Sequence, residues 1–262
     1  ALGNSLLRGT GTRQPDCCLM SQISTLVVLS SAHEVLFERY FRPTLPAGLQ
    51  LELVRLADNK SDGSFLSAEW QDAMCAKVRH ALDFCRSAKE GQMFLVSDVD
   101  VQFFPRFDAE CFRRHFDSFG CDLVFQKERF RVGDLEVNCG FYAGRNTKSV
   151  RDLLQAALEN LEADQIKNEQ MAVNALLRST KLPHASFDRR FYARTHGFPP
   201  PKNIWMHHAS WTANIPEKIR QLDRVRRIVN GSGISMHVEA YDEHIERAEG
   251  RSPGLKTRVR AT

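Results

Sequence analysis

The sequence predicts an α/β fold, in which helices flank a mostly parallel central sheet that carries an added antiparallel portion. Apolar strand-like runs alternate with helical patterns through the first half of the chain, and this order is typical of a parallel sheet. In the second half, strand-like runs follow one another across short loops, which favours antiparallel pairing. The chain has 262 residues, of which 42% are apolar, enough to bury the core of one domain.

The elements of the first half follow in order. Residues 23–31, ISTLVVLSS, read as a buried strand, and residues 49–57 alternate like a second strand. Between them, residues 32–45 have helical spacing that ends at two prolines. The clearest helix spans residues 67–88. Residues 92–100 then read as a central strand, apolar on both faces until its end.

The second half continues with shorter elements. We expect, in order, a short helix at 107–119, strands at 122–128 and 135–145, helices at 148–161 and 168–179, and strand-like segments at 186–193 and 203–210. The expected domain spans 23–230. A flexible segment at 1–22 precedes it, and a charged, partly disordered extension at 231–262 follows.

Charge and composition narrow the classes of partner. The formal charge of +4 is a mild basic bias that suits a diphosphate-bearing ligand. Lys and Arg do not cluster as they do in proteins that bind duplex nucleic acid, so we expect no nucleic-acid partner. The seven cysteines show neither a CxxC zinc pair nor the density of a disulfide scaffold.

No apolar run reaches the length that spans a bilayer, so we expect no membrane span in this chain. The expected location is cytoplasmic. The Golgi lumen is the alternative, if an N-terminal anchor was removed, because the sequence begins with Ala and contains the glycosylation sequons Asn59-Lys-Ser61 and Asn230-Gly-Ser232.

Two aspartates follow the central strand within the segment FLVSDVDVQFF. Residues two apart in a strand point to the same side, so Asp98 and Asp100 share a face while Val99 points into the fold. Two adjacent carboxylates repel each other and attract a cation, and Mg²⁺ or Mn²⁺ prefers such oxygen ligands. The tripeptide alone is equally compatible with two solvated aspartates at a strand end.

Other phosphate and metal motifs fit this segment less well. A calcium-binding EF-hand loop would need Gly and Glu where the chain has Phe103 and Ala109. A phosphohydrolase of the haloacid-dehalogenase type would use Asp98 as nucleophile, but the fifth motif residue is Gln102 and two strands precede the motif. It stays an alternative. Neither GxxxxGK(S/T) nor GxGxxG occurs.

The surroundings of the pair form an ordered set of further motifs. These are the helix segment WQDAMCAKVRHAL with Lys77, the segment Asn138-Cys139-Gly140-Phe141, the pair Glu169-Gln170, and His208-Ala-Ser-Trp211 followed by Lys218. Together with the aspartates they resemble the nucleotide-diphospho-sugar transferase domain, a GT-A family, over residues 23–225. The chain departs from the family pattern at Cys139, where Thr is frequent, at Glu169, where Asp is usual, and in WTANIPEK, which lacks the usual Gly.

The resemblance implies a Rossmann-like fold of GT-A type and a glycosyltransferase that uses Mn²⁺ or Mg²⁺. The implied donor is a nucleotide-diphosphate sugar, with UDP as the expected nucleotide, and the implied acceptor is a hydroxyl group of a glycan or another molecule. Hexosyl or pentosyl transfer with retention of configuration is expected. A non-catalytic module that binds sugar nucleotides or glycans is a further alternative.

The resemblance also implies a metal site. Asp100 is the expected direct ligand, and Asp98 is expected to contact the ribose or a metal-bound water. A third ligand is then needed. Because adjacent residues of a strand face opposite ways, only one of His207 and His208 can reach the metal. His208 matches the family segment, so it is the expected ligand.

The expected catalytic groups are Lys77, Asn138, Glu169 and Gln170, and Lys218 is expected to bind the donor. Lys77 supplies a cation to the diphosphate, and Lys218 is expected to reach the same phosphates. Asn138 and Gln170 carry amides suited to sugar hydroxyls. Glu169 is a candidate to orient the acceptor, to act as base or to stabilise an oxocarbenium-like centre.

The remaining candidates rest on position in the chain. Ser30 and Ser31 end the first strand and Asp58 follows the second, where GT-A folds commonly meet the nucleoside. Asp164-Gln165 competes with the later acidic-Gln pair and ranks second. Two tryptophans, Trp205 and Trp211, are candidates to stack on sugar rings, although core packing is the commoner role.

Overall fold

The structure is a computed structural model that describes residues 22–56, 68–130, 135–163, 166, 168–196, 200–201 and 203–231. Three of the candidate residues, Asp58, Asp164 and Gln165, lie outside these ranges. So do the expected terminal segments 1–22 and 231–262, apart from Gln22 and Gly231. Within the described residues, no helix is both long and apolar enough to cross a membrane.

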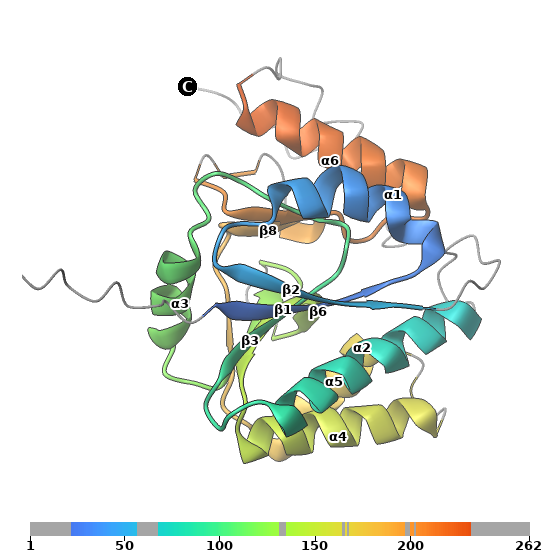
Figure 1. Ribbon diagram of the computed structural model, residues 1–262, viewed down its shortest axis with the longest axis vertical. Helices are drawn as coiled ribbons and strands as arrows, with labels where there is room; N and C mark the ends of the chain where they lie inside the picture. The colour runs from blue at the N-terminus through green and yellow to red at the C-terminus, as the bar shows by residue number, and fades with distance from the viewer. Residues whose placement is uncertain are drawn as a thin grey trace, which may run out of the picture.

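A six-stranded sheet with the order β2-β1-β3-β6-β5-β7 forms the centre of the fold (Figure 1). Its strands are β1 (Ile23–Leu29), β2 (Leu49–Arg55), β3 (Met93–Ser97), β5 (Leu123–Lys127), β6 (Val137–Arg145) and β7 (Ala185–Ser186). All neighbours pair in parallel except β6, which runs antiparallel to both β3 and β5. The expected mostly parallel sheet is therefore confirmed.

A second, three-stranded sheet has the order β4-β9-β8. Its strands are β4 (Val101–Phe103), β8 (Phe191–Ala193) and β9 (Met206–His208). The β4–β9 pair is antiparallel, and the β8–β9 pair is parallel. This sheet supplies the added antiparallel portion, and its paired strands β4 and β9 lie more than 100 residues apart in the chain.

Both faces of the large sheet are buried. Neighbouring residues of β1 point to opposite sides, so that Leu26 and Val27 belong to two different apolar clusters, and Phe94 and Leu95 of β3 do the same. This arrangement explains why β3 reads as a continuous apolar run up to Ser97 instead of an alternating one.

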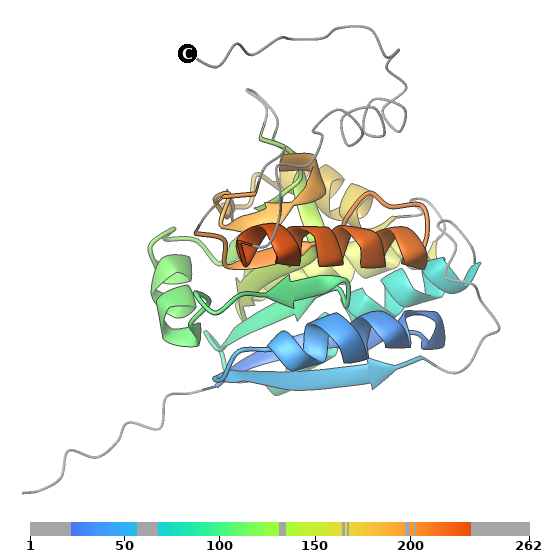
Figure 2. The ribbon, with the colours of Figure 1, turned by 90° about the horizontal axis from the view of Figure 1, so that it is seen from above.

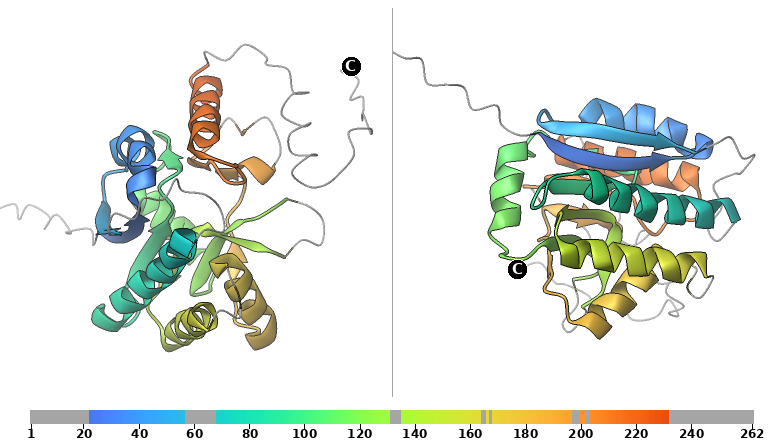
Figure 3. Two further views of the ribbon diagram at one scale, coloured as in Figure 1. Left: turned by 90° about the vertical axis from the view of Figure 1, so that its right-hand side faces the viewer. Right: turned by 60° about the horizontal axis from the view of Figure 1, so that its bottom comes forward.

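Three helices cover one face of the sheet. They are α2 (Ala68–Ser87), α4 (Lys148–Glu162) and α5 (Glu169–Thr180), and Figure 3 shows them packed beside one another. The amide of Asn174 fastens α5 to the sheet, since it donates to the carbonyl of Val137 at 2.9 Å and accepts from its N–H at 3.0 Å. The middle of α5 is thereby held close to the start of β6.

The other face is covered by a helical segment after β1, by α3 (Ala109–Asp117) and by α6 (Ile215–Val229). The first of these changes its hydrogen-bonding pattern along its length, through η1 (Ser31–His33), α1 (Glu34–Leu36), η2 (Phe37–Phe41) and η3 (Arg42–Thr44). It lies beside α6 (Figure 2), where Asp223 accepts hydrogen bonds from Arg39 and Tyr40.

The structure differs from the sequence-based expectations in two strands. The predicted strand at 92–100 ends at Ser97, and the chain then turns into β4 of the other sheet. The predicted strand at 186–193 is split into β7 and β8, because Asp188 folds back to accept from the backbone N–H and the guanidinium of Arg190. Each apparent single strand passes from one sheet to the other.

Helix α6 is absent from the sequence-based expectations, although its start carries recognisable signals. The side chain of Asn214 caps the helix by accepting from the N–H of Glu217 at 3.0 Å, and the Glu217 carboxylate reaches back to the N–H of Ala213 at 2.8 Å. Pro216 occupies the first turn, where it removes no needed donor.

Candidate active site

The two aspartates lie where the chain passes from the large sheet to the small one. Val99 between them is only 6% exposed and packs into the core. The backbone N–H of Asp98 donates to the carbonyl of Gly140 at 2.7 Å, and the carbonyl of Asp100 accepts from Ala209 at 2.9 Å. Both carboxylates consequently face one cavity.

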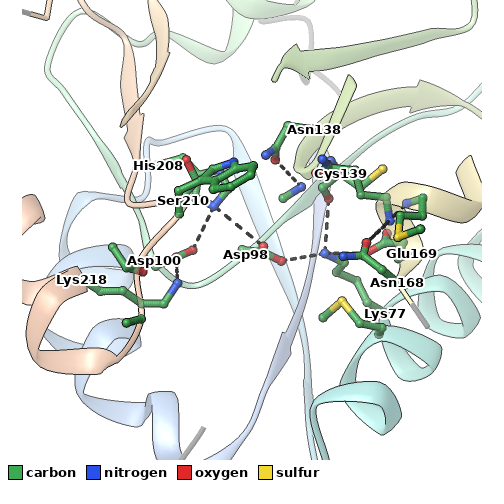
Figure 4. A pocket seen from close by; sticks show the side chains of 17 residues that line it. Lys77, Asp98, Asp100, Asn138, Cys139, Asn168, Glu169, His208, Ser210 and Lys218 are labelled. Atoms are coloured by element: carbon green, nitrogen blue, oxygen red, sulfur yellow. Dashed lines mark hydrogen bonds and ion pairs between the residues drawn. The ribbon is translucent and has the colours of Figure 1, made fainter. Parts of the chain in front are cut away.

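Strand pairing brings a histidine to the aspartates. The antiparallel register of β4 and β9 places Val101 opposite His208, so this histidine lies next to the residue that follows Asp100. Its Nε2 lies 3.3 Å from Asp100 Oδ1 and 3.9 Å from Asp98 Oδ2 (Figure 4).

His207 faces away from the cavity, as the alternation of strand residues requires. It accepts from Gln102 through Nδ1 at 3.1 Å and bonds Gln221 through Nε2 at 3.1 Å. Burial lowers the pKa of this imidazole to about 3, so it is neutral near pH 7. With both ring nitrogens occupied, His207 has a structural role in the core.

A second glutamine fixes which nitrogen of His208 carries the proton. The Nε2 group of Gln126 donates to the carbonyl of Phe191 at 3.0 Å, so its Oε1 must be the atom that meets His208 Nδ1 at 2.7 Å. Nδ1 is therefore the donor. In the neutral ring, the lone pair of Nε2 then points at two carboxylate oxygens.

This arrangement fits a divalent cation. Three acceptor atoms converge, one each from Asp98, Asp100 and His208, within 4.8 Å of one another. Asp100 Oδ1 is buried and has no hydrogen-bond partner among the described residues. Burial raises the pKa of Asp100, but Lys218 and His208 outweigh it and hold that pKa well below its ordinary value, so the carboxylate is charged. Two carboxylates and one imidazole are ligand groups that suit a divalent metal ion.

Lys77 lies on the other side of Asp98 from this cluster (Figure 4). Its side chain is only 5% exposed, and Nζ donates to Asp98 Oδ1 at 2.8 Å, to Glu169 Oε2 at 2.7 Å and to the carbonyl of Cys139 at 3.3 Å. Burial lowers the pKa of Lys77, but the two carboxylates outweigh burial and raise that pKa above its ordinary value. The ammonium is therefore permanently charged.

Glu169 is the first residue of α5, and it is 2% exposed. Burial raises the pKa of its carboxyl to about 7, against the opposing effect of Lys77. Oε1 has no hydrogen-bond partner in the described part of the chain. Near neutral pH this group therefore exists in both protonation states, which suits a group that exchanges protons.

Lys218 lies in the first turn of α6, and its Nζ forms an ion pair with Asp100 Oδ2. Its position beside the aspartates depends on the capped start of that helix. Lys218 and Lys77 thus lie on opposite sides of the acidic pair, as Figure 4 shows. Both line the cavity.

Glu128, at the end of β5, was not among the candidates from sequence. It is 1% exposed. Its Oε2 accepts from Asn138 at 2.6 Å and from Gln170 at 3.2 Å, and its Oε1 accepts from the indole N–H of Trp211. One buried carboxylate therefore orients both predicted sugar-binding amides. The signal that could have identified Glu128 was its position, because it is a third acidic residue that directly follows a strand.

Gly140 lies where no side chain fits. A Cβ at this position would come within 2.7 Å of Asp98 Oδ2 and 2.9 Å of His208 Nε2. The space that glycine leaves is the space in which the carboxylate and the imidazole approach each other.

Most of these groups line one cavity of about 830 Å³, within the roughly 300–1,000 Å³ of small-molecule sites. Gln126, Glu128 and His207 are not among its lining residues. Lining residues from the sequence-based predictions are Lys77, Asp98, Asp100, Asn138, Glu169, Gln170, His208, Trp211 and Lys218. Nine of the candidates, from five stretches of chain, thus come together.

Three candidates do not line the cavity. Ser31 is exposed, and the hydroxyl of Ser30 pairs with His33 Nδ1 at 2.8 Å. Trp205 packs against Phe107 and Phe191 in an aromatic cluster. The stacking role proposed for Trp205 is therefore wrong, and core packing prevails.

Comparison with known proteins supports these observations. The chain matches the family model for nucleotide-diphospho-sugar transferases over residues 37–225. No curated protein matches the chain at a significant level.

Two solved structures have a similar fold. One is a glycosyltransferase involved in the glycosylation of the major capsid of PBCV-1, with 13% identity, a TM-score of 0.53, and coverage of 77% of this chain and 99% of that chain. The other is the glycosyltransferase GlyE of Streptococcus pneumoniae TIGR4, with 10% identity, a TM-score of 0.50, and coverage of 90% of this chain and 66% of that chain. These likenesses confirm the predicted α/β fold of GT-A type.

Proposed function

Because this chain belongs to the nucleotide-diphospho-sugar transferase family, we propose that it transfers a sugar from a nucleotide-diphosphate donor to a hydroxyl acceptor. The proposed nucleotide is UDP, and the proposed acceptor is a glycan or another hydroxyl-bearing molecule. Family membership leaves the alternative of a phosphohydrolase that uses Asp98 without support.

The observation that carries the proposal is the pairing of charges at one end of the cavity. Asp98, Asp100 and His208 offer acceptor atoms to a cation, and Lys77 and Lys218 flank them with ammonium groups. A diphosphate needs this kind of positive surroundings, and it needs them most when it departs with an additional charge.

The reaction breaks the bond between the anomeric carbon and the β-phosphate oxygen, which keeps the bonding electrons. A bond forms between the anomeric carbon and the acceptor oxygen, whose proton is lost. When bound, Mn²⁺ or Mg²⁺ would act as a Lewis acid for the diphosphate. The buried ion pairs of Lys77 keep its ammonium protonated. This positive charge stabilises the departing oxygen.

The other end of the cavity is suited to the transferred sugar. Asn138 and Gln170 present amides that Glu128 holds in place, and such uncharged donors and acceptors match hydroxyl groups. Glu169 lies between this end and Lys77. Its free oxygen and its pKa of about 7 make it the proposed group to receive the proton of the acceptor or to stabilise positive charge at the anomeric carbon.

Slow hydrolysis of donors in the absence of an acceptor tests the proposal. A panel of UDP-, GDP- and CDP-sugars is incubated with Mn²⁺ or Mg²⁺, and the released nucleoside diphosphate is measured. We expect turnover of at least one donor that is abolished by chelation and by Asp100→Asn. Absence of turnover with every donor, together with absence of donor binding, would contradict the proposal. Donor binding without transfer to any acceptor would instead indicate the non-catalytic alternative.

Once a donor and an acceptor are known, the anomeric configuration of the product is read by NMR. Retention is the proposed outcome, and an inverted product would contradict it.

A further inference from the structure

Two of the most exposed apolar side chains line the mouth of the cavity. Among the described residues, Trp211 is 44% exposed and Met171 is 61% exposed, and both contribute to the cavity wall. The groups at the depth of the cavity are much less exposed, with Asn138 at 5% and Glu169 at 2%. The polar groups of the site therefore lie inside the cavity, and the indole of Trp211 lies at the cavity opening.

Trp211 adopts an unfavourable backbone conformation. Its φ is 55°, in the left-handed region that bulky residues avoid. The other non-glycine residue with a positive φ in the described part of the chain is Lys181, which follows the last residue of α5, where this conformation is common. Trp211 occupies no such helix end. Strain of this kind persists only where the surroundings impose it.

The surroundings hold Trp211 at both ends. Arg194, which is 3% exposed, donates to its backbone carbonyl. Its indole N–H donates to Oε1 of Glu128. The other oxygen of Glu128 accepts from Asn138 and Gln170, so one carboxylate fixes the indole relative to the sugar-binding amides.

A comparison with Trp205 shows that core packing does not explain this placement. Both indoles carry an arginine over the ring, Arg190 at 4.3 Å from the centroid of Trp205 and Arg129 at 5.1 Å from that of Trp211. Trp205 lies within an aromatic cluster away from the cavity. Trp211 lines the cavity and remains 44% exposed despite the arginine, so part of its surface is available to a ligand.

We propose that Trp211 is the surface on which the ring of a saccharide acceptor lies. This inference rests on the proposed transferase function, and it narrows the acceptor to a sugar. The face of an aromatic ring carries partial negative charge, and the C–H groups of one pyranose face carry partial positive charge, so the two surfaces attract each other. The edge of the same sugar presents hydroxyls.

The position of Trp211 favours the acceptor over the donor sugar. The donor sugar is covalently attached to its diphosphate, so it lies at the buried end of the cavity. Asn138, Glu169 and Gln170 can bind its hydroxyls there. The acceptor approaches from solvent, where Trp211 is exposed at the cavity wall. A lipid acceptor would need a broader apolar surface, whereas Ser210 and Thr212 make this wall polar on both sides of the indole.

Titration of the full chain with saccharides tests the inference without any donor. Methyl pyranosides and short oligosaccharides are added, and the heat of binding is measured by calorimetric titration. We expect a saturable change with at least one saccharide, retained in Trp205→Phe and weakened about tenfold in Trp211→Gly, since an aromatic contact of about 1.5 kcal/mol corresponds to a factor of ten. Trp211→Phe should bind with intermediate affinity.

Two substitutions distinguish the loss of the aromatic ring from a loss of folding stability. Trp211→Gly and Trp211→Ala remove the same side chain, but only glycine tolerates the positive φ, so the melting temperature of Trp211→Gly should exceed that of Trp211→Ala. Weak saccharide binding by a well-folded Trp211→Gly protein supports the inference. Unchanged affinity in Trp211→Gly would overturn it, as would transfer to a peptide hydroxyl or an alkyl alcohol with no saccharide bound.

The two proposals fail in different ways. If the titration shows saccharide binding but no donor is bound or turned over, the transferase proposal fails. If donors are turned over but Trp211→Gly binds saccharides as the unmodified chain does, only the acceptor inference fails.

Discussion

The imidazole of His208 and the backbone of Gly140 lie so close together that a side chain at position 140 would occupy the space of the ring. The two residues come from β9 and β6, which belong to different sheets. The absence of a side chain at position 140 leaves room for the carboxylate of Asp98 beside Nε2 of His208.

We expect Gly140→Ala to weaken Mn²⁺ binding by about 10–100-fold, the range found when groups that orient metal ligands are disturbed. The added methyl group would displace the carboxylate of Asp98 or the ring of His208. Calorimetric titration with Mn²⁺ measures the effect.

Gly144→Ala is the matched control. It lies on the same strand, and its added Cβ would meet the ring of Phe94 and the side chain of Leu123 in the core. This variant should lose stability and keep its Mn²⁺ affinity. Equal Mn²⁺ affinities in the two variants would contradict the proposed metal site.

A second prediction concerns Gln126, which orients His208. Gln126→Leu removes the acceptor for Nδ1–H, so we expect Mn²⁺ affinity to fall about 10–100-fold. Gln126→Glu keeps an acceptor and should lose much less. Gln102→Leu makes the equivalent change beside His207 and should lower stability without changing the affinity. If Gln102→Leu weakens Mn²⁺ binding as much as Gln126→Leu, His207 has been assigned the wrong role.

The third prediction is a pH dependence that arises from Glu169. Its pKa of about 7 in the fold means that the carboxylate form increases as pH rises through 7, and donor turnover should rise with it. Glu169→Gln should lower turnover and abolish this acidic limb. A limb of the same shape in Glu169→Gln would assign the titration to another group.

The same group affects stability. Because the folded pKa exceeds the usual value of 4.5, its contribution to stability is complete below pH 4.5 and is lost as pH rises through 7. Chemical unfolding at several pH values should therefore show that the chain loses more stability across this range than Glu169→Gln does.

Lys77 gives the fourth prediction. Lys77→Met leaves two carboxylates without their buried partner, so we expect the free energy of unfolding to fall by about 3–5 kcal/mol. Adding Glu169→Gln removes one of those carboxylates and should restore part of the loss. The urea midpoints of the two single variants and the double variant measure this coupling. Strict additivity would show that the Lys77–Glu169 pair contributes no interaction energy.

Much of this arrangement could be predicted from the sequence because it follows local rules. The apolar run before Asp98 indicates a buried strand, and the carboxyl end of such a strand is where ligands bind. The inward position of Val99 between the aspartates follows from alternation.

Other features depend on long-range pairing that spacing cannot show. The passage from β3 to β4 looks like one strand, because both pieces are apolar and the aspartates alone mark the change of sheet. The approach of His208 depends on the register with Val101, more than 100 residues away. It was expected only through the family resemblance.

Glu128 was missed because a charged residue at a strand end is ordinarily solvated, and nothing in its neighbourhood shows that Asn138, Gln170 and Trp211 converge on it. Helix α6, by contrast, was missed although Asn214, Pro216 and Glu217 form a recognisable signal for the start of a helix. Its consequence for the site is direct, because that start places Lys218 beside Asp100.

The most direct test of the central claim is the affinity of nucleoside diphosphates with and without metal. UDP and GDP are titrated into the chain in the presence of Mn²⁺ or of a chelator, and into Asp100→Asn and His208→Ala with Mn²⁺. The account predicts that at least one nucleotide binds the unmodified chain only with Mn²⁺ and that either substitution abolishes most of this binding. Nucleotide binding that is equally tight with the chelator, or unchanged in both variants, would contradict it.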